Sequence, residues 1–80
     1  MLVNLQRIKA ERLGRGLTQE DMAKKMGWHD RSSYARREKG VTPIGADELI
    51  KIAEILDCTN DMSLFFKLDV PKREQSSKNL

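Results

Sequence analysis

Residues 18–27 read Thr18-Gln19-Glu20-Asp21-Met22-Ala23-Lys24-Lys25-Met26-Gly27, and this stretch carries clear helix start and stop signals. Its first four residues fit a capping box, in which the Thr18 hydroxyl accepts a hydrogen bond from a free backbone N–H and the Asp21 carboxylate reaches back to the cap. Acidic residues follow the cap and two lysines lie near the end, which suits the helix dipole. Two methionines and an alanine supply the apolar face. We therefore predict a short helix between Thr18 and Gly27, which can end it in a left-handed conformation.

Helix signals continue on both sides of this stretch. Upstream, Leu5 and Ile8 stand three residues apart on a helix predicted over about residues 3–13, with two glycines following as stops. Downstream, Asp30 is an N-cap candidate for a helix over residues 31–39, which the next glycine ends. This third helix is polar, so it needs either strong support from its neighbours or a function on its outer face.

The second half of the chain predicts two more helices. Residues 46–56 follow Gly45, an acceptable N-cap, and carry apolar residues at the i, i+3, i+4, i+7 spacing of an amphipathic helix. Thr59 is expected to cap a short fifth helix, with Met62, Phe65 and its neighbour Phe66 turned inward. Strand signals are poor throughout, since apolar and polar residues do not alternate for long anywhere.

The composition fits one small globular domain. The chain has 80 residues, of which 39% are hydrophobic and 34% charged. We predict an all-α fold, a compact bundle of four to five short helices over residues 1–68, followed by a flexible tail over residues 69–80. A single cysteine forms neither an internal disulfide nor a zinc site of its own. No apolar run approaches the ~20 residues of a membrane span. We therefore expect a cytoplasmic protein without a metal or cofactor.

Charge is unevenly distributed along the chain. Residues 1–40 contain ten Lys/Arg and five Asp/Glu, a net charge of +5, and residues 41–80 contain five and seven, a net charge of −2. A basic first half is typical of a protein that meets a polyanion with one face, although ordinary solvated surfaces also show such asymmetry.

Four segments of this sequence occur in the same order as in a known family. They are residues 8–12, Ile-Lys-Ala-Glu-Arg; residues 15–23, Arg-Gly-Leu-Thr-Gln-Glu-Asp-Met-Ala; residues 38–40, Glu-Lys-Gly; and residues 46–56. Together they resemble the lambda-repressor/Cro-like (XRE) helix-turn-helix family, over about residues 4–66. The resemblance implies a lambda-repressor-like fold and a transcriptional regulator that binds double-stranded DNA with its third helix in the major groove.

The resemblance also assigns roles to individual residues. It implies base contacts by Arg31, Ser32 and Arg36, and phosphate contacts by Gln19, Ser33, Lys39 and Arg12. An arginine can grip guanine O6 and N7 with two hydrogen bonds, and a serine can meet donor or acceptor edges. Arg12 is also expected to form a structural ion pair with Glu38.

Two departures from the family pattern affect these assignments. The chain has one residue more than usual between Gln19 and Gly40, and the surplus falls in residues 27–30, so a longer turn precedes the third helix. Arg37 stands where the family has an apolar residue. Three explanations are open: the arginine extends outward over the surface, the helix is rotated, or another residue such as Trp28 fills the gap.

Isolated residues have simpler interpretations. Trp28 is expected to plug the core or the turn, with a partner subunit or the DNA backbone as alternatives. We expect His29 to be exposed, Cys58 to be a small buried hydrophobic residue and Tyr34 to lie in the core. No nucleophile with a neighbouring base and no glycine-rich phosphate loop is present, so we do not expect an enzyme.

Two hypotheses for function follow. In the first, the protein is a repressor that binds as a homodimer to a near-palindromic operator, with half-sites about 34 Å apart. In the second, it is a protein-interaction module, such as an antitoxin or an antirepressor-binding protein, since one fold hosts many functions. The longer turn, Arg37 and the segment after Phe66 motivate the second hypothesis.

Overall fold

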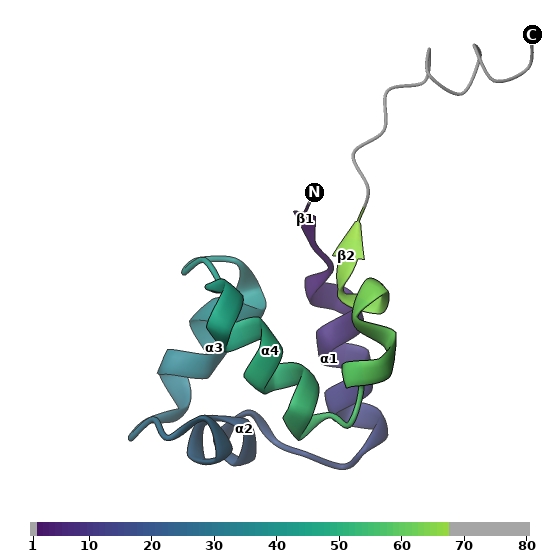
Figure 1. Cartoon of the computed structure of the whole chain (residues 1–80). Helices are drawn as coiled ribbons and strands as arrows, with labels where there is room; N and C mark the ends of the chain where they lie inside the picture. The colour runs from purple at the N-terminus through teal and green to yellow at the C-terminus, as the bar shows by residue number, and fades with distance from the viewer. Residues whose placement is uncertain (1, 68–80) are drawn as a thin grey trace, which may run out of the picture.

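Short helices build most of residues 2–67, the part of the chain that the computed structural model describes. They are α1 (Leu5–Gly14), α2 (Gln19–Met26), α3 (Arg31–Lys39), α4 (Ala46–Ile55) and the 3-10 helix η1 (Thr59–Phe65) (Figure 1). The predicted all-α bundle is confirmed. In Figure 1, α2 lies beneath the other helices, and the first and last described residues lie together at the top. The predicted tail over residues 69–80 lies outside the described residues.

A small strand pair joins the two ends of the described chain, and the sequence did not predict it. β1 (Leu2–Val3) and β2 (Phe66–Lys67) run antiparallel, with Val3 opposite Phe66. The backbone N–H of Asn4 then donates to the Phe65 carbonyl at 2.6 Å, and the Asn4 side chain caps α1. Because the first residues are extended, α1 begins later than predicted.

The predicted boundaries of α2 and α3 are confirmed. The Thr18 hydroxyl accepts a hydrogen bond from the Asp21 N–H at 2.9 Å, and the Asp21 carboxylate accepts one from the Thr18 N–H at 2.8 Å. Gly27 ends α2 with a φ of 87°. Asp30 caps α3 through its side chain, and Gly40 ends that helix with a φ of 86°. All these signals lie within a few residues of the helix end that they define, which is why the sequence reveals them.

The last two helices differ slightly from the prediction. α4 follows Gly45 as predicted, and the Glu48 carboxylate accepts a hydrogen bond from the Gly45 N–H at 2.9 Å. The fifth helix is a 3-10 helix whose cap residue is Cys58, so Thr59 is its first residue and not its cap. Asp61 has non-helical dihedrals, with φ −129° and ψ 45°, so η1 is kinked rather than continuous.

The core takes at least one large side chain from every helix. Ile8, Met22, Tyr34, Ile52 and Phe65 are each at most 1% exposed. The predicted core position of Tyr34 is confirmed, as is the inward orientation of Phe65. Burial of one anchor from each short helix stabilises a fold in which no single helix is long enough to be stable alone.

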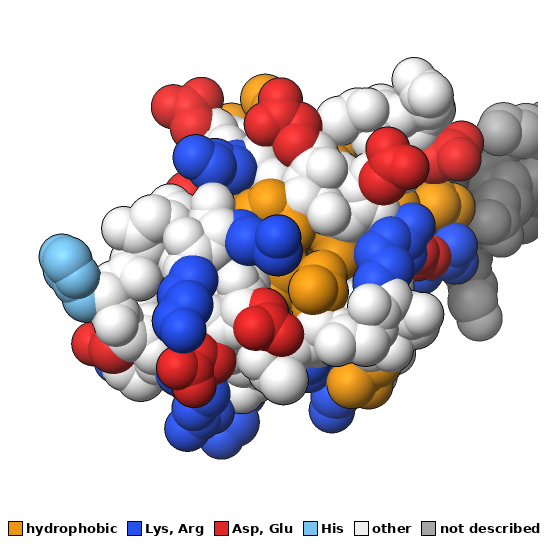
Figure 2. Space-filling model, turned by 90° about the horizontal axis from the view of Figure 1, so that it is seen from below, with side chains coloured by type: hydrophobic (Ala, Val, Ile, Leu, Met, Phe, Trp, Pro, Cys, Tyr) orange, Lys and Arg blue, Asp and Glu red, His pale blue; other side chains and the backbone are white. Residues whose placement is uncertain are grey.

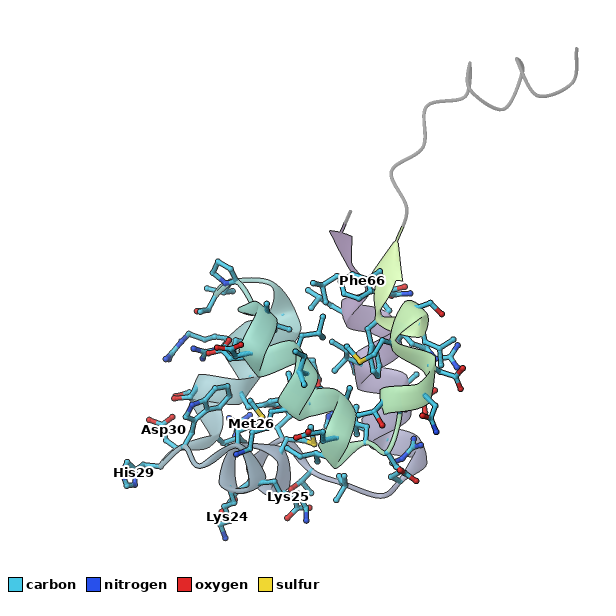
Figure 3. The ribbon with its side chains drawn as sticks, in the orientation of Figure 1. Lys24, Lys25, Met26, His29, Asp30 and Phe66 are labelled. Carbon is cyan, nitrogen blue, oxygen red and sulfur yellow. The ribbon has the colours of Figure 1, made fainter. Side chains whose placement is uncertain are left out.

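The remaining isolated residues lie as predicted. Cys58 is buried, and His29 is exposed at the outer end of the turn between α2 and α3, where it points away from the body (Figure 3). Among the described residues, no helix combines the length and the apolar character needed to cross a bilayer.

Candidate nucleic-acid interface

α2 and α3 are consecutive helices joined by the short turn Gly27–Asp30. The cap of α3 uses its first serines: the Ser32 and Ser33 hydroxyls both donate to the Asp30 carboxylate, at 3.1 and 2.8 Å. These bonds lower the pKa of Asp30, with Ser33 as the main cause. Each serine oxygen therefore lies at the first turn of α3 and keeps lone pairs for an external donor.

The outer face of α3 carries exposed cations. Arg31, Arg36 and Lys39 are exposed, and Ser32 is half-buried. Ser32, Arg36 and Lys39 are spaced by four and three residues, so they lie along one side of the helix. Three of the five sequence-predicted residues on α3 thus share one side of the helix, and Arg31 and Ser33, next to Ser32 in the sequence, lie at either edge of that side.

The inner face of α3 is held by a buried carboxylate. Glu38 accepts two hydrogen bonds from Arg12, at 2.9 and 3.0 Å. It accepts a third from the Gln19 amide at 3.1 Å and a fourth from the Tyr34 hydroxyl at 2.6 Å. Burial alone raises the pKa of Glu38, but these donors outweigh it and hold the pKa below its usual value. The carboxylate is therefore a charged hub that joins α1, α2 and α3.

The guanidinium of Arg12 is fully hydrogen-bonded around this carboxylate. Its side chain is only 7% exposed, and its remaining terminal nitrogen donates to the Leu17 carbonyl at 2.8 Å. The hydrogen bond to Glu38 raises the pKa of Arg12 further, so the guanidinium stays charged. The structure thus buries Arg12 between α1 and α3, with each guanidinium nitrogen donating to a protein acceptor.

Gln19 links the Glu38 carboxylate to the start of α3. Its amide nitrogen donates to Glu38, and its amide oxygen accepts a hydrogen bond from Arg31 at 2.8 Å. Neither partner of Gln19 follows from the sequence pattern, because side-chain rotamers decide both contacts. The chain from Arg12 through Glu38 and Gln19 to Arg31 connects the core to an exposed cation.

Arg37 occupies a position where the family has an apolar residue, and its contacts show how it fits there without a rotation of α3. Its guanidinium carbon lies 4.2 Å from the centre of the Trp28 ring. The same guanidinium pairs with Glu48 at 3.0 Å and donates to the Ser33 carbonyl at 2.6 Å. Because Tyr34 and Glu38 still face the core, α3 is not turned around its axis. Trp28 packs against the core as predicted, and Arg37 extends across it.

The face around α2 carries both signs of charge. Seen from below, Lys and Arg side chains alternate with Asp and Glu around a small apolar area (Figure 2). Lys24 and Lys25 at the end of α2 are exposed and point away from the body (Figure 3). On this face no large area carries Lys and Arg alone. The attraction for a polyanion is therefore strongest where the Asp and Glu side chains are fewest.

Comparison with protein families decides the affiliation. The sequence model of the Helix-turn-helix family matches residues 8–59, more than half of the chain. The chain belongs to this helix-turn-helix family. The match runs from Ile8 in α1 through α2, α3 and α4, so the helix-turn-helix pair itself is α2 and α3. Membership supports a DNA-binding regulator. Comparisons with curated proteins and with solved structures find no match.

Proposed function

We propose that this helix-turn-helix protein is a sequence-specific transcriptional repressor that binds double-stranded DNA. α3 would enter the major groove, which is about 12 Å wide and admits one helix. The observation that supports this most strongly is the contrast between the two faces of α3. Its outer face carries exposed Arg36 and Lys39, and its inner face is fixed to α1 and α2 through Glu38. Exposed Arg31 is the first residue of the helix and bonds to Gln19.

We divide the site residues into those that contact bases and those that contact phosphates. We assign base contacts to Arg31, Ser32 and Arg36. Arg31 uses one terminal nitrogen for Gln19, which leaves its other nitrogens for a base edge or a phosphate. This bond orders the side chain before DNA binds, so less conformational entropy remains to be lost in the complex.

We assign phosphate contacts to Gln19, Ser33 and Lys39. Ser33 donates its single hydroxyl hydrogen to Asp30, so this hydroxyl must turn from Asp30 to the phosphate when DNA binds. Gln19 is the first residue of α2, and a helix start presents backbone N–H groups and a favourable dipole to an anion. We do not retain Arg12 among the phosphate contacts that the resemblance implied, because its side chain is buried and its nitrogens are engaged. Its role is to position Glu38.

We further propose that the protein acts as a homodimer in the cytoplasm and that its operator is nearly palindromic. Two copies of α3 would then read half-sites about one helical turn, roughly 34 Å, apart. In this proposal residues 1–68 form the DNA-binding domain and residues 69–80 a flexible tail.

Selection of random duplex DNA tests the proposal. The full chain is incubated with a random library, and dissociation constants of the selected and of random duplexes are measured at several salt concentrations. We expect convergence on a near-palindrome that binds about 10³-fold or more tightly than random DNA. Weak, steeply salt-dependent binding with no enriched sequence would contradict it.

One observation favours a protein partner as a second function. A largely apolar groove of about 410 Å³ is lined by residues of β1, of the loop before α4, of α4, of η1 and of β2. Ile50, one of its lining residues, is 50% exposed, so the groove presents a contiguous apolar surface to solvent. In the second hypothesis the occupant is a toxin or an antirepressor. A toxin gene adjacent to the gene for this chain would favour that function.

A further inference from the structure

The side of α3 that bears Arg37 is attached to two neighbouring segments at once. The guanidinium stacks on Trp28, which lies in the turn before α3, and pairs with Glu48, which lies in the first turn of α4. Its remaining nitrogen donates to the Ser33 carbonyl one turn earlier in α3. One side chain therefore connects the segment that enters α3 with the helix that follows it.

Glu48 is itself fixed in place. Its carboxylate accepts hydrogen bonds from Arg37, at 3.0 and 3.2 Å, and from the Gly45 N–H, at 2.9 Å. The bond from Arg37 is the main reason that the pKa of Glu48 is lowered, with the backbone of Gly45 second. The anchor of Arg37 is thus a carboxylate that is itself bound to the backbone at the start of α4, rather than a free surface carboxylate.

The geometry suits a guanidinium and no other side chain. A planar group is needed to stack on the indole and to meet both carboxylate oxygens at the same time. Lysine supplies the charge without the plane, and leucine supplies bulk without either. The side chain of Arg37 is only 18% exposed, so this pair is better shielded from water than an ordinary surface ion pair.

Arg37 is unsuited to touch DNA itself. Nε and Nη2 donate to Glu48, and Nη1 donates to the Ser33 carbonyl. Its immediate neighbour Arg36 is exposed and points to the outer face of α3. Any influence of Arg37 on DNA is therefore exerted through the position of α3, and hence through Arg31 and Arg36.

We propose that Arg37 is a positioning residue for sequence recognition: the Trp28–Arg37–Glu48 cluster fixes the tilt of α3 after its lengthened turn. This proposal rests on the proposed DNA-binding function. Phosphate contacts tolerate small shifts, because their attraction is largely electrostatic, whereas bidentate base contacts do not. Loss of the cluster is expected to reduce discrimination between sequences far more than binding to DNA in general.

The test compares the discrimination ratio, the dissociation constant for random DNA divided by that for the selected operator, across matched variants. Arg37→Leu, Arg37→Lys and Glu48→Gln each break the cluster, and Arg7→Leu is the control. Arg7 also pairs with a carboxylate, Glu11, but on α1. We expect each cluster variant to lose about tenfold of the ratio, within the 5- to 150-fold that one bidentate base contact provides, and to bind random DNA within about threefold of the parent.

Fluorescence separates positioning from general stability. Trp28 is the single tryptophan of the chain, so its emission reports the stacking directly. A changed Trp28 signal with an unchanged discrimination ratio would overturn the proposal and leave Arg37 as a stabilising contact only. If Arg37→Leu does not fold, Arg37→Lys and Glu48→Gln decide the question. If the unmodified protein selects no sequence, the proposed function fails, and the role of Arg37 fails with it. If the unmodified protein is selective and the variants are equally selective, only the role of Arg37 fails.

Discussion

Arg12 grips Glu38 with two parallel hydrogen bonds, from Nε at 2.9 Å and from Nη2 at 3.0 Å, across 26 positions of sequence. Both side chains are nearly inaccessible, at 7% and 4% exposure. Two charges are tolerated in such a buried place because they have opposite signs and are hydrogen-bonded to each other. Gln19 and Tyr34 donate the remaining hydrogen bonds to the Glu38 carboxylate. The buried pair therefore fixes how α1 and α3 meet.

Replacing Glu38 with glutamine is expected to destabilise the fold severely. The variant leaves the Arg12 guanidinium buried without a counter-charge, which typically costs about 3–5 kcal/mol. That is a large part of the roughly 5–15 kcal/mol available to a domain. The measurement is the free energy of unfolding from urea titration, with Glu54→Gln, at an exposed position of α4, as the control within about 0.5 kcal/mol. A loss below 1 kcal/mol in Glu38→Gln, on the order of an ordinary surface change, would contradict the inferred role.

The same carboxylate predicts how stability depends on pH. The pKa of Glu38 is lowered in the fold, relative to about 4.3 in an unfolded chain. Folding therefore favours the charged form, and the stabilisation is fully present above about pH 4.3 and lost as the pH falls through the folded pKa. Urea midpoints measured from neutral to acid pH should show the unmodified protein losing more stability on acidification than Glu38→Gln does. Parallel curves would show that Glu38 is not responsible.

Much of the fold could be predicted because its signals are local. Thr18, Gly27, Asp30 and Gly40 each define a helix end through contacts within a few residues. The β1–β2 pair could not be predicted, since it consists of two residues on each side joined mainly by backbone hydrogen bonds between distant parts of the chain. Such a short ladder leaves no alternation in the sequence.

The candidate site could be predicted only in outline. The resemblance predicts an ion pair between Arg12 and Glu38, and the structure contains this pair. It did not reveal that Gln19 joins Glu38 to Arg31, or that Arg37 reaches Glu48. These contacts depend on side-chain rotamers and on the path of the turn between α2 and α3, which residue spacing does not encode.

The two helix-ending glycines should respond differently to alanine. Gly27 and Gly40 have nearly equal φ values, 87° and 86°, so alanine carries a similar backbone cost of about 1–2 kcal/mol at each. A Cβ at Gly27 meets nothing within 4 Å, whereas one at Gly40 lies 3.2 Å from the Leu5 side chain. We expect Gly40→Ala to be the more destabilising in urea titration, and each variant serves as the control for the other. A larger loss in Gly27→Ala would contradict the assigned contact.

Two cations on the same face of α3 should affect DNA binding in different ways. Arg36→Ala is expected to weaken operator binding by about 1–3 kcal/mol and to relax the preference at one base position, because it removes a base contact. Lys39→Ala is expected to weaken binding evenly across sequences and to reduce the slope of log K against log salt by about one unit, because it removes a phosphate contact. Dissociation constants for the selected operator and its single-base variants, at several salt concentrations, distinguish the two effects.

The control for this pair is Lys51→Ala, which removes an exposed cation from α4 and not from α3. It should leave both the base preference and the affinity nearly unchanged, because physiological salt screens the attraction between the DNA and a charge that lies far from it. If Arg36→Ala binds the operator as tightly as the unmodified protein, α3 does not present Arg36 to the bases. If Arg36→Ala instead reproduces the even weakening expected of Lys39→Ala, then Arg36 contacts a phosphate, and Arg31 and Ser32 remain as the residues that read sequence.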